Sequence, residues 1–177
     1  MFKVVTIRDV VRVEPKYLGH ELKEIVTEIL RKKYERTVDK DLGIILAIWN
    51  VRDIGEGYIP LGDGASYHEV TFDCLCFLPK LHEVIEGKVT DIVEFGAFIN
   101  IGPIDALVHI SQITDDFLSF DRRANLLVGK ETGKKLKIGD NVRARIVAVS
   151  LKGTVPETKI GLTMRQPGLG KLAWLGE

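Results

Sequence analysis

Five short runs of β-forming residues, separated by glycines and turn residues, occupy the second half of this 177-residue chain and limit what it can fold into. Short strands at this spacing are typical of a small β-barrel. An insertion between the third and fourth runs, roughly residues 114–138, carries much of the local positive charge. The five runs cover residues 87–93, 97–101, 106–110, 141–149 and 159–163.

Residues 1–80 have a different pattern, which predicts a small α+β domain with an antiparallel sheet backed by one helix. Apolar residues at 3.6-residue spacing follow Pro15 and predict the helix. Runs rich in β-branched residues at 1–12, 44–53 and 70–77 predict the strands. The pattern changes between residues 79 and 83, so we expect two domains, residues 1–80 and 81–177. The apolar positions of the helix are Leu18, Leu22, Ile25, Val26, Ile29 and Leu30.

A glycine-rich segment, residues 54–64, separates two of the predicted strands and reads as a loop. Glycine has no side chain, so backbone groups in such a loop can approach a partner closely. An exposed turn between strands is the alternative interpretation. The residues that define the loop are Gly55, Gly57, Pro60, Gly62 and Gly64.

The composition argues against several classes of protein. The longest apolar run, residues 42–49, is far short of the roughly 20 residues that span a bilayer. The first residues reach Arg8 and Asp9 before any apolar signal segment. Cys74 and Cys76 are two residues apart, which fits a reducing compartment and leaves no second pair for a four-ligand zinc site. We expect a cytoplasmic protein without a membrane segment.

Motifs for catalysis and cofactors are incomplete. His20, His68, His82 and His109 are scattered, without the spacing that holds a metal. The glycines of residues 129–135 are too close for a phosphate loop, and Lys135 stands where that loop needs Ser or Thr. We therefore expect no metal, no cofactor and no catalytic centre.

Alternation along the barrel strands turns aromatic and basic side chains outward. Exposed rings can stack on the bases of single-stranded nucleic acid, and cations can follow its phosphates. Phe95, beside Gly96 at a bend, fits either an exposed ring or one packed under a loop. The predicted outward set is Phe98, His109, Arg143 and Arg145. The predicted core set is Ala97, Ile99, Ile101, Val108, Ile110, Val142, Ala144 and Ile146.

The charge distribution is uneven although the whole chain has equal numbers of acidic and basic residues. Residues 81–121 hold one basic and eight acidic side chains, whereas residues 122–171 hold 12 basic and three acidic ones. The basic stretch fits a polyanion-binding surface. A folded surface that mixes the two stretches is equally compatible with this pattern.

Five blocks follow one another in the second half of the chain: Gly87-x-Val89, 95–98 (Phe-Gly-Ala-Phe), 107–111 (Leu-Val-His-Ile-Ser), 138–145 and 160–163. With these blocks, residues 86–164 resemble an S1 domain, an RNA-binding member of the OB-fold barrels. The resemblance implies that Phe95, Phe98 and His109 contact RNA, with Lys159 as a basic residue entering the fifth strand. Ser150 stands where such domains often carry an aspartate.

Three further features lie outside the five blocks: the N-terminal strand–helix unit, the glycine-rich loop and the C-terminal segment 162–172. With these features, essentially the whole chain resembles the larger (E′) stalk subunits of archaeal RNA polymerases. It implies a non-catalytic protein that forms a heterodimer with the smaller F subunit of the polymerase. It also implies that residues 1–80 dock on the polymerase core and that the S1 domain holds emerging single-stranded RNA.

Two other interpretations stay open at the level of the sequence. An S1 domain also serves as an RNA tether in exosome and translation-initiation complexes. A dimerisation module whose barrel never touches RNA is the second. The first would carry different neighbouring domains, and the second predicts that Phe98 and His109 are dispensable for RNA contact.

Overall fold

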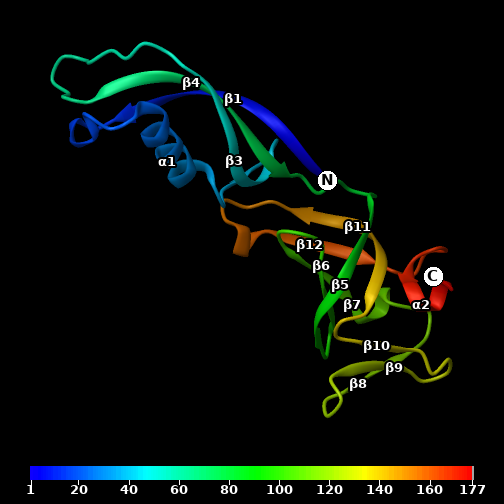
Figure 1. Ribbon diagram of the computed structural model, residues 1–177. Helices are drawn as coiled ribbons and strands as arrows, with labels where there is room; N and C mark the ends of the chain where they lie inside the picture. Colours follow the sequence, from blue (N-terminus) through cyan, green and yellow to red (C-terminus); the bar gives the residue numbers. More distant parts are fainter. Residues whose placement is uncertain (177) are drawn as a thin grey trace. The chain divides into compact units, whose positions relative to one another are not determined.

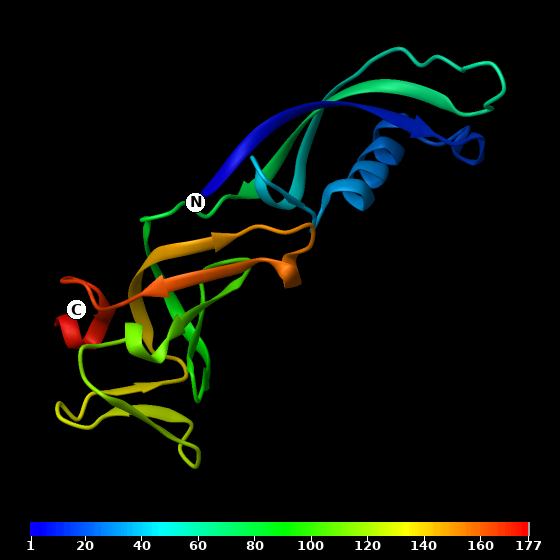
Figure 2. The same cartoon turned by 180° about the vertical axis from the view of Figure 1, so that it is seen from behind.

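The computed structural model describes residues 1–176, which divide into two compact units. The first unit comprises Met1–Leu78 together with Lys152–Val155, and the second comprises Pro79–Leu151 and the chain from Pro156 onward. No helix within residues 1–176 is both long enough and apolar enough to cross a membrane. Figures 1 and 2 show the two units from opposite sides.

The first unit is a four-stranded antiparallel sheet with one helix along one face, which confirms the predicted α+β class (Figure 1). The strand order is β1-β4-β3-β2, so β4 lies in the centre between the two other long strands. The elements are β1 Phe2–Val13, η1 Pro15–Tyr17, α1 Leu22–Tyr34, β2 Val38–Asp39, β3 Gly43–Ile54 and β4 Ser66–Phe77.

The helix begins later than its apolar pattern predicts. Leu18 was expected on the buried stripe, but it precedes α1 and is 82% exposed. Leu18 follows the 3-10 turn of Pro15–Tyr17, and between Leu18 and α1 stands Gly19, whose φ of 92° lies in the left-handed region and interrupts any continuous right-handed helix. The apolar pattern in the sequence therefore begins about one helical turn before the helix does.

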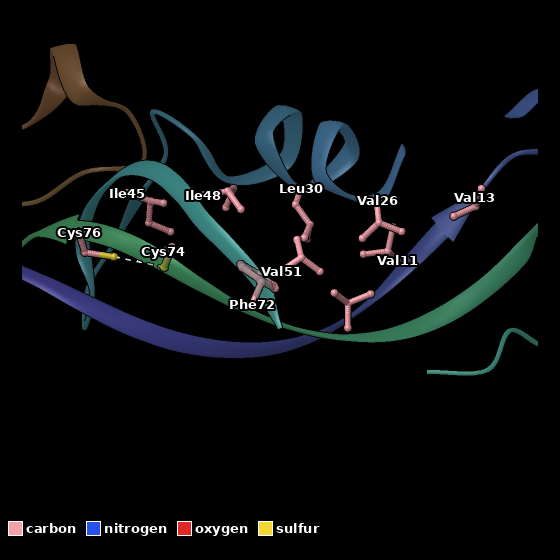
Figure 3. Packing of buried hydrophobic residues seen from close by; sticks show 11 residues of the cluster. Val11, Val13, Val26, Leu30, Ile45, Ile48, Val51, Phe72, Cys74 and Cys76 are labelled. Atoms are coloured by element: carbon pink, nitrogen blue, oxygen red, sulfur yellow. Dashed lines mark hydrogen bonds between the residues drawn. The ribbon is translucent and has the colours of Figure 1, made fainter. Parts of the chain in front are cut away.

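The core of the first unit lies between α1 and the sheet (Figure 3). Val26 and Leu30 are fully buried and point from the helix toward the strands. Cys74 and Cys76 lie on the same face of β4, with their sulfur atoms 3.5 Å apart and both thiols free. Burial, with a smaller effect of the hydrogen bond to Cys76, raises the pKa of the Cys74 thiol to about 12. These cysteines are thus core residues.

The second unit contains the predicted five-stranded barrel. The sheet order is β12-β7-β6-β5-β11-β13, and pairing between β11 and β12 closes it. Residues predicted to face inward, such as Ala97, Ile99, Val108 and Ile146, are buried. Ile110 is only half-buried, because the chain turns into η2 there. The elements are β5 Val84–Val93, β6 Gly96–Asn100, β7 Asp105–His109, η2 Ile110–Gln112, β11 Asn141–Ser150, η3 Val155–Glu157, β12 Lys159–Thr163, β13 Gly170–Lys171 and α2 Leu172–Leu175.

The insertion between β7 and β11 forms a second, three-stranded antiparallel sheet, here called the insertion sheet. Sequence analysis predicted no strands there, because each is only three or four residues long and is flanked by charged residues. Leu127 and Leu136 are nevertheless fully buried on one face of it. Its strands are β8 Leu118–Asp121, β9 Leu126–Gly129 and β10 Lys135–Lys137.

Candidate nucleic-acid interface

Phe95 and Phe98 form an aromatic pair at the turn between β5 and β6. Their ring centroids are 6.5 Å apart and the rings are nearly perpendicular. Phe95 is 53% exposed and Phe98 is half-buried, so of the two possibilities for Phe95 the structure has the exposed ring. Both rings therefore offer apolar surface to solvent at one end of the barrel.

His109 lies beside this pair because β6 and β7 are antiparallel and His109 is opposite Gly96. The backbone N–H of Ser111 donates to the Nδ1 atom of His109 at 3.3 Å. Because a backbone N–H can only donate, Nδ1 is the acceptor and the neutral ring carries its proton on Nε2. The exposed ring thus presents an N–H donor to a ligand. Phe95, Phe98 and His109 are called the platform below.

Gly96 allows the close approach of the two strands that carry the platform. A Cβ atom at this position would overlap the backbone carbonyl oxygen of Val108 on β7. Both groups belong to the paired backbone, so neither can move without disturbing the ladder. The glycine between the two phenylalanines is required by the approach of β6 to β7.

Lys159 shares the outward face of the barrel with Phe98. Antiparallel pairing sets Phe98 opposite Leu107, and parallel pairing sets Leu107 beside Gly161 on β12. Lys159 is two residues before Gly161, so it lies on the same face one pleat further along, and it is exposed. This register sets Lys159 level with Asp105, one pleat from the row of Phe98 on the side away from His109.

Arg143 and Arg145 point outward as predicted. Arg145 is opposite Thr163 on β12, and Thr163 follows Leu162, which pairs with Val108 on β7, so Arg145 lies level with His109 two strands away. Arg143 lies one pleat further along β11 and is opposite Glu86 on β5. Arg143 donates to the Glu86 carboxylate at 3.0 and 2.8 Å. Arg145 is half-buried, and its Nε atom has no hydrogen-bond partner within the described part of the chain.

Two arginines that sequence analysis did not single out lie next to the platform. The Nη2 atom of Arg122, from the turn between β8 and β9, is 3.3 Å from the carboxylate of Glu94, the residue before Phe95. Arg165 donates to the carbonyl oxygen of Ser111 at 3.4 Å and to Asp115 at 2.8 Å. The alternation of side chains along strands could not predict these two arginines, because both lie in loops.

The base of the glycine-rich loop is tied to β4. Gly55 donates to the carbonyl oxygen of Glu69 at 2.8 Å, and Tyr58 and Tyr67 bridge and stack with centroids 5.7 Å apart. Gly57 lies directly against the buried imidazole of His68, where any side chain would overlap the ring. The loop is thus held by specific contacts at this end.

The remaining part of the loop is exposed and apolar. Ile59 and Leu61, on either side of Pro60, present 67% and 106% of their surface to solvent. A cavity of about 400 Å³ lies under the loop, lined in part by Ile59, Tyr17 and Gly64. Exposed apolar side chains on an anchored loop are typical of a protein-docking surface. Gly62 occupies the left-handed region with a φ of 88°, which a side chain would strain.

Asp63 organises the end of this loop. Arg12 donates to its carboxylate at 3.0 and 2.9 Å, the Tyr67 hydroxyl at 2.7 Å and the Ala65 N–H at 3.1 Å. The hydrogen bonds from Arg12, then those from Tyr67 and Ala65, hold the pKa of Asp63 well below its ordinary range. A lowered carboxyl pKa stabilises the folded loop above the unfolded pKa, about 4, and this effect is lost as the pH falls through the folded pKa.

We expect Asp63→Asn to increase amide hydrogen exchange at residues 62–65 at neutral pH, because the charge-assisted hydrogen bonds from Arg12 are weakened. In the wild-type protein, amide exchange at these residues should become as fast as in the variant only at acidic pH, where the Asp63 carboxylate is protonated. Asp53→Asn, an exposed carboxylate on neighbouring β3, is the matched control and should change nothing. Equal exchange in wild type and Asp63→Asn at pH 7 would contradict this role.

Comparison with known proteins matches both halves of the chain. Residues 8–64 match the family described as "SHS2 domain found in N terminus of Rpb7p/Rpc25p/MJ0397". Residues 78–155 match the family described as "S1 RNA binding domain". The two matches fall on the α+β unit and on the barrel.

Relatives over the full length are similar to this chain as well. It is 47% identical to DNA-directed RNA polymerase subunit Rpo7 of Sulfolobus acidocaldarius, across 100% of this chain and 96% of the relative. It is 46% identical to the Rpo7 subunit of Saccharolobus solfataricus, across 99% of this chain and 97% of the relative. DNA-directed RNA polymerase III subunit RPC8 of Bos taurus is 26% identical over 98% of both chains.

Proposed function

Because the chain belongs to the family of Rpo7 stalk subunits of archaeal DNA-directed RNA polymerase, we propose that it pairs with the smaller F subunit and holds nascent single-stranded RNA on its S1 domain. In this role it is a non-catalytic, cytoplasmic component of the polymerase that needs no cofactor. The observation that carries the RNA-binding part is the platform of one exposed and one half-buried aromatic ring and a histidine donor at one end of the barrel.

The platform suits single-stranded RNA because bases that are not in a duplex expose their faces for stacking. Stacking is tolerant of sequence, since every base has a π-face. Lys159 lies on the same side of the barrel and supplies a charge for the backbone. Contacts of Arg143 and Arg145 with RNA stay a prediction, and the pairing that sets Arg145 level with His109 supports a contact of Arg145 with RNA on the platform.

Residues 1–80 form the proposed polymerase-docking domain, with the glycine-rich loop as its contact element. The loop combines a fixed base with exposed Ile59 and Leu61, which can be buried on a partner without ordering the backbone first. Gly55, Gly57, Pro60, Gly62 and Gly64 are proposed to shape that contact. An exosome or translation-initiation tether is the alternative, which the full-length similarity to Rpo7 subunits disfavours.

Affinity purification of the tagged protein from native lysate at moderately high salt tests the assembly. We expect mass spectrometry to find a small helical subunit together with the large polymerase subunits. Recovery of exosome or initiation-factor components in their place would refute the polymerase assignment and leave the S1 domain as a tether.

We expect Phe98→Ala to weaken binding of a single-stranded oligoribonucleotide by about 5- to 30-fold, because a lost stacking contact costs about 1–2 kcal/mol. Fluorescence anisotropy at fixed salt measures the affinity. Phe2→Ala removes an exposed ring from the first unit and should leave affinity unchanged. Unchanged binding of Phe98→Ala would instead favour a dimerisation module that does not touch RNA.

A further inference from the structure

The insertion sheet is the most basic part of the second unit. Residues 117–137 contain six basic and two acidic side chains. One of the acidic residues, Asp121, has an oxygen that accepts the backbone N–H groups of Arg123 and Ala124, at 2.9 and 3.2 Å. Its carboxylate thus shapes the β8–β9 turn, and the surrounding surface keeps a net positive charge.

This basic turn adjoins the platform. The Arg122–Glu94 ion pair joins the β8–β9 turn to the β5–β6 turn that carries Phe95, and Figures 1 and 2 show the two turns side by side. Both partners are largely exposed, and such a pair contributes little to stability. Arg122 can therefore exchange Glu94 for a phosphate at small cost. Arg123 is also exposed, and its side chain has no partner among residues 1–176.

Strand alternation puts further cations on the outer face of the insertion sheet. Leu136 is buried, so Lys135 and Lys137 on either side of it point to the opposite, exposed face. Lys137 pairs with Leu126 next to the β8–β9 turn, and Lys135 pairs with Val128 one pleat further on. The cations thus succeed one another along the sheet, starting beside Phe95.

We propose that RNA leaving the platform continues over the insertion sheet, with Arg122, Arg123, Lys137 and Lys135 tracking its backbone. This inference rests on the proposed RNA-binding function and extends the site to a longer transcript. OB-fold proteins occupy about 4–16 nucleotides of single strand, so a short oligonucleotide can be held by the platform alone. Longer RNA reaches the sheet, where contact with phosphates carries no sequence preference.

RNA fits this surface better than an acidic protein does. The cores of protein interfaces are depleted of lysine and centre on buried apolar anchors. The outer face of the insertion sheet instead presents exposed Lys135 and Lys137, while Leu126 and Val128 beside them are half-buried, and it adjoins the aromatic rings of the platform. Cations next to stacking rings are the combination used for single strands.

The triple variant Arg123→Glu, Lys135→Glu, Lys137→Glu tests the proposal in the full chain, with oligouridylates of five and 20 nucleotides as probes. We expect its affinity for the 20-mer to fall by roughly tenfold or more, and the slope of log K against log salt to shrink by about 2, at about 0.7 for each lost phosphate contact. Affinity for the 5-mer should stay within about twofold, since the platform is intact. All three side chains are exposed, and circular dichroism verifies the fold.

The matched control reverses three surface charges elsewhere: Lys23→Glu, Lys40→Glu, Lys80→Glu. An equal loss of 20-mer affinity in this control would mean that net charge alone matters, and it would overturn the proposal that RNA runs over the insertion sheet. The proposal would also be overturned if the triple variant bound the 20-mer with wild-type affinity, or if it lost affinity equally for both oligonucleotides. Loss of polymerase subunits in the purification with RNA binding intact would identify a protein-docking face instead. A failure of the proposed RNA-binding function can be told apart from a failure of this inference. In that case Phe98→Ala would bind the 5-mer with unchanged affinity.

Discussion

Phe72→Ala is expected to lower the free energy of unfolding of the first unit by about 3–5 kcal/mol, a large fraction of what a domain of this size has. Phe72 lies on the central strand β4 and is fully buried. Its ring packs 5.3 Å from that of Tyr34 at the end of α1, so it links the sheet to the helix. Truncation would leave a cavity between two elements that cannot close on it without repacking the core.

Urea unfolding followed by tryptophan fluorescence measures this effect, because each unit has one tryptophan. Trp49 on β3 reports on the first unit, in a Trp174→Phe background. Val4→Ala on the open face of β1 is the control and should change stability by less than about 0.5 kcal/mol. A similar small change for Phe72→Ala would show that the helix is not held through this ring.

Gly96→Ala is expected to destabilise the barrel by about 3 kcal/mol, at the upper end of the range for overpacking. The added methyl group would overlap the Val108 carbonyl oxygen, and both atoms belong to the β6–β7 ladder. Relief requires the strands to separate where Phe95, Phe98 and His109 are brought together. We therefore expect RNA affinity to fall as well, by at least as much as in Phe98→Ala.

Thermal unfolding and RNA anisotropy test the two parts of this prediction separately. Gly153→Ala is the matched control, since its added methyl group meets open space and its backbone is not left-handed. That substitution should be neutral or slightly stabilising, because it restricts the unfolded chain. A Gly96→Ala protein with wild-type stability and RNA affinity would show that the strand spacing tolerates a side chain.

The barrel was predicted well because its strands alternate strictly. Ala97 and Ile99 are buried and Phe98 faces outward, as parity requires. The helix was also found, but its start was misjudged at Leu18, because a periodic pattern does not reveal that Gly19 adopts a left-handed backbone. The insertion sheet was missed, since a three-residue strand such as β10 has too few residues to establish a period.

The sequence by itself determined which side chains lie inside and which lie outside, because that depends only on the period of each element. It also determined the family, through motifs that follow one another along the chain. Only the tertiary structure decided which outward residues are neighbours. Strand pairing across β12 set Arg145 level with His109, and loop contacts brought Arg122 to Glu94. These distances depend on register between segments far apart in the chain, which no local pattern encodes.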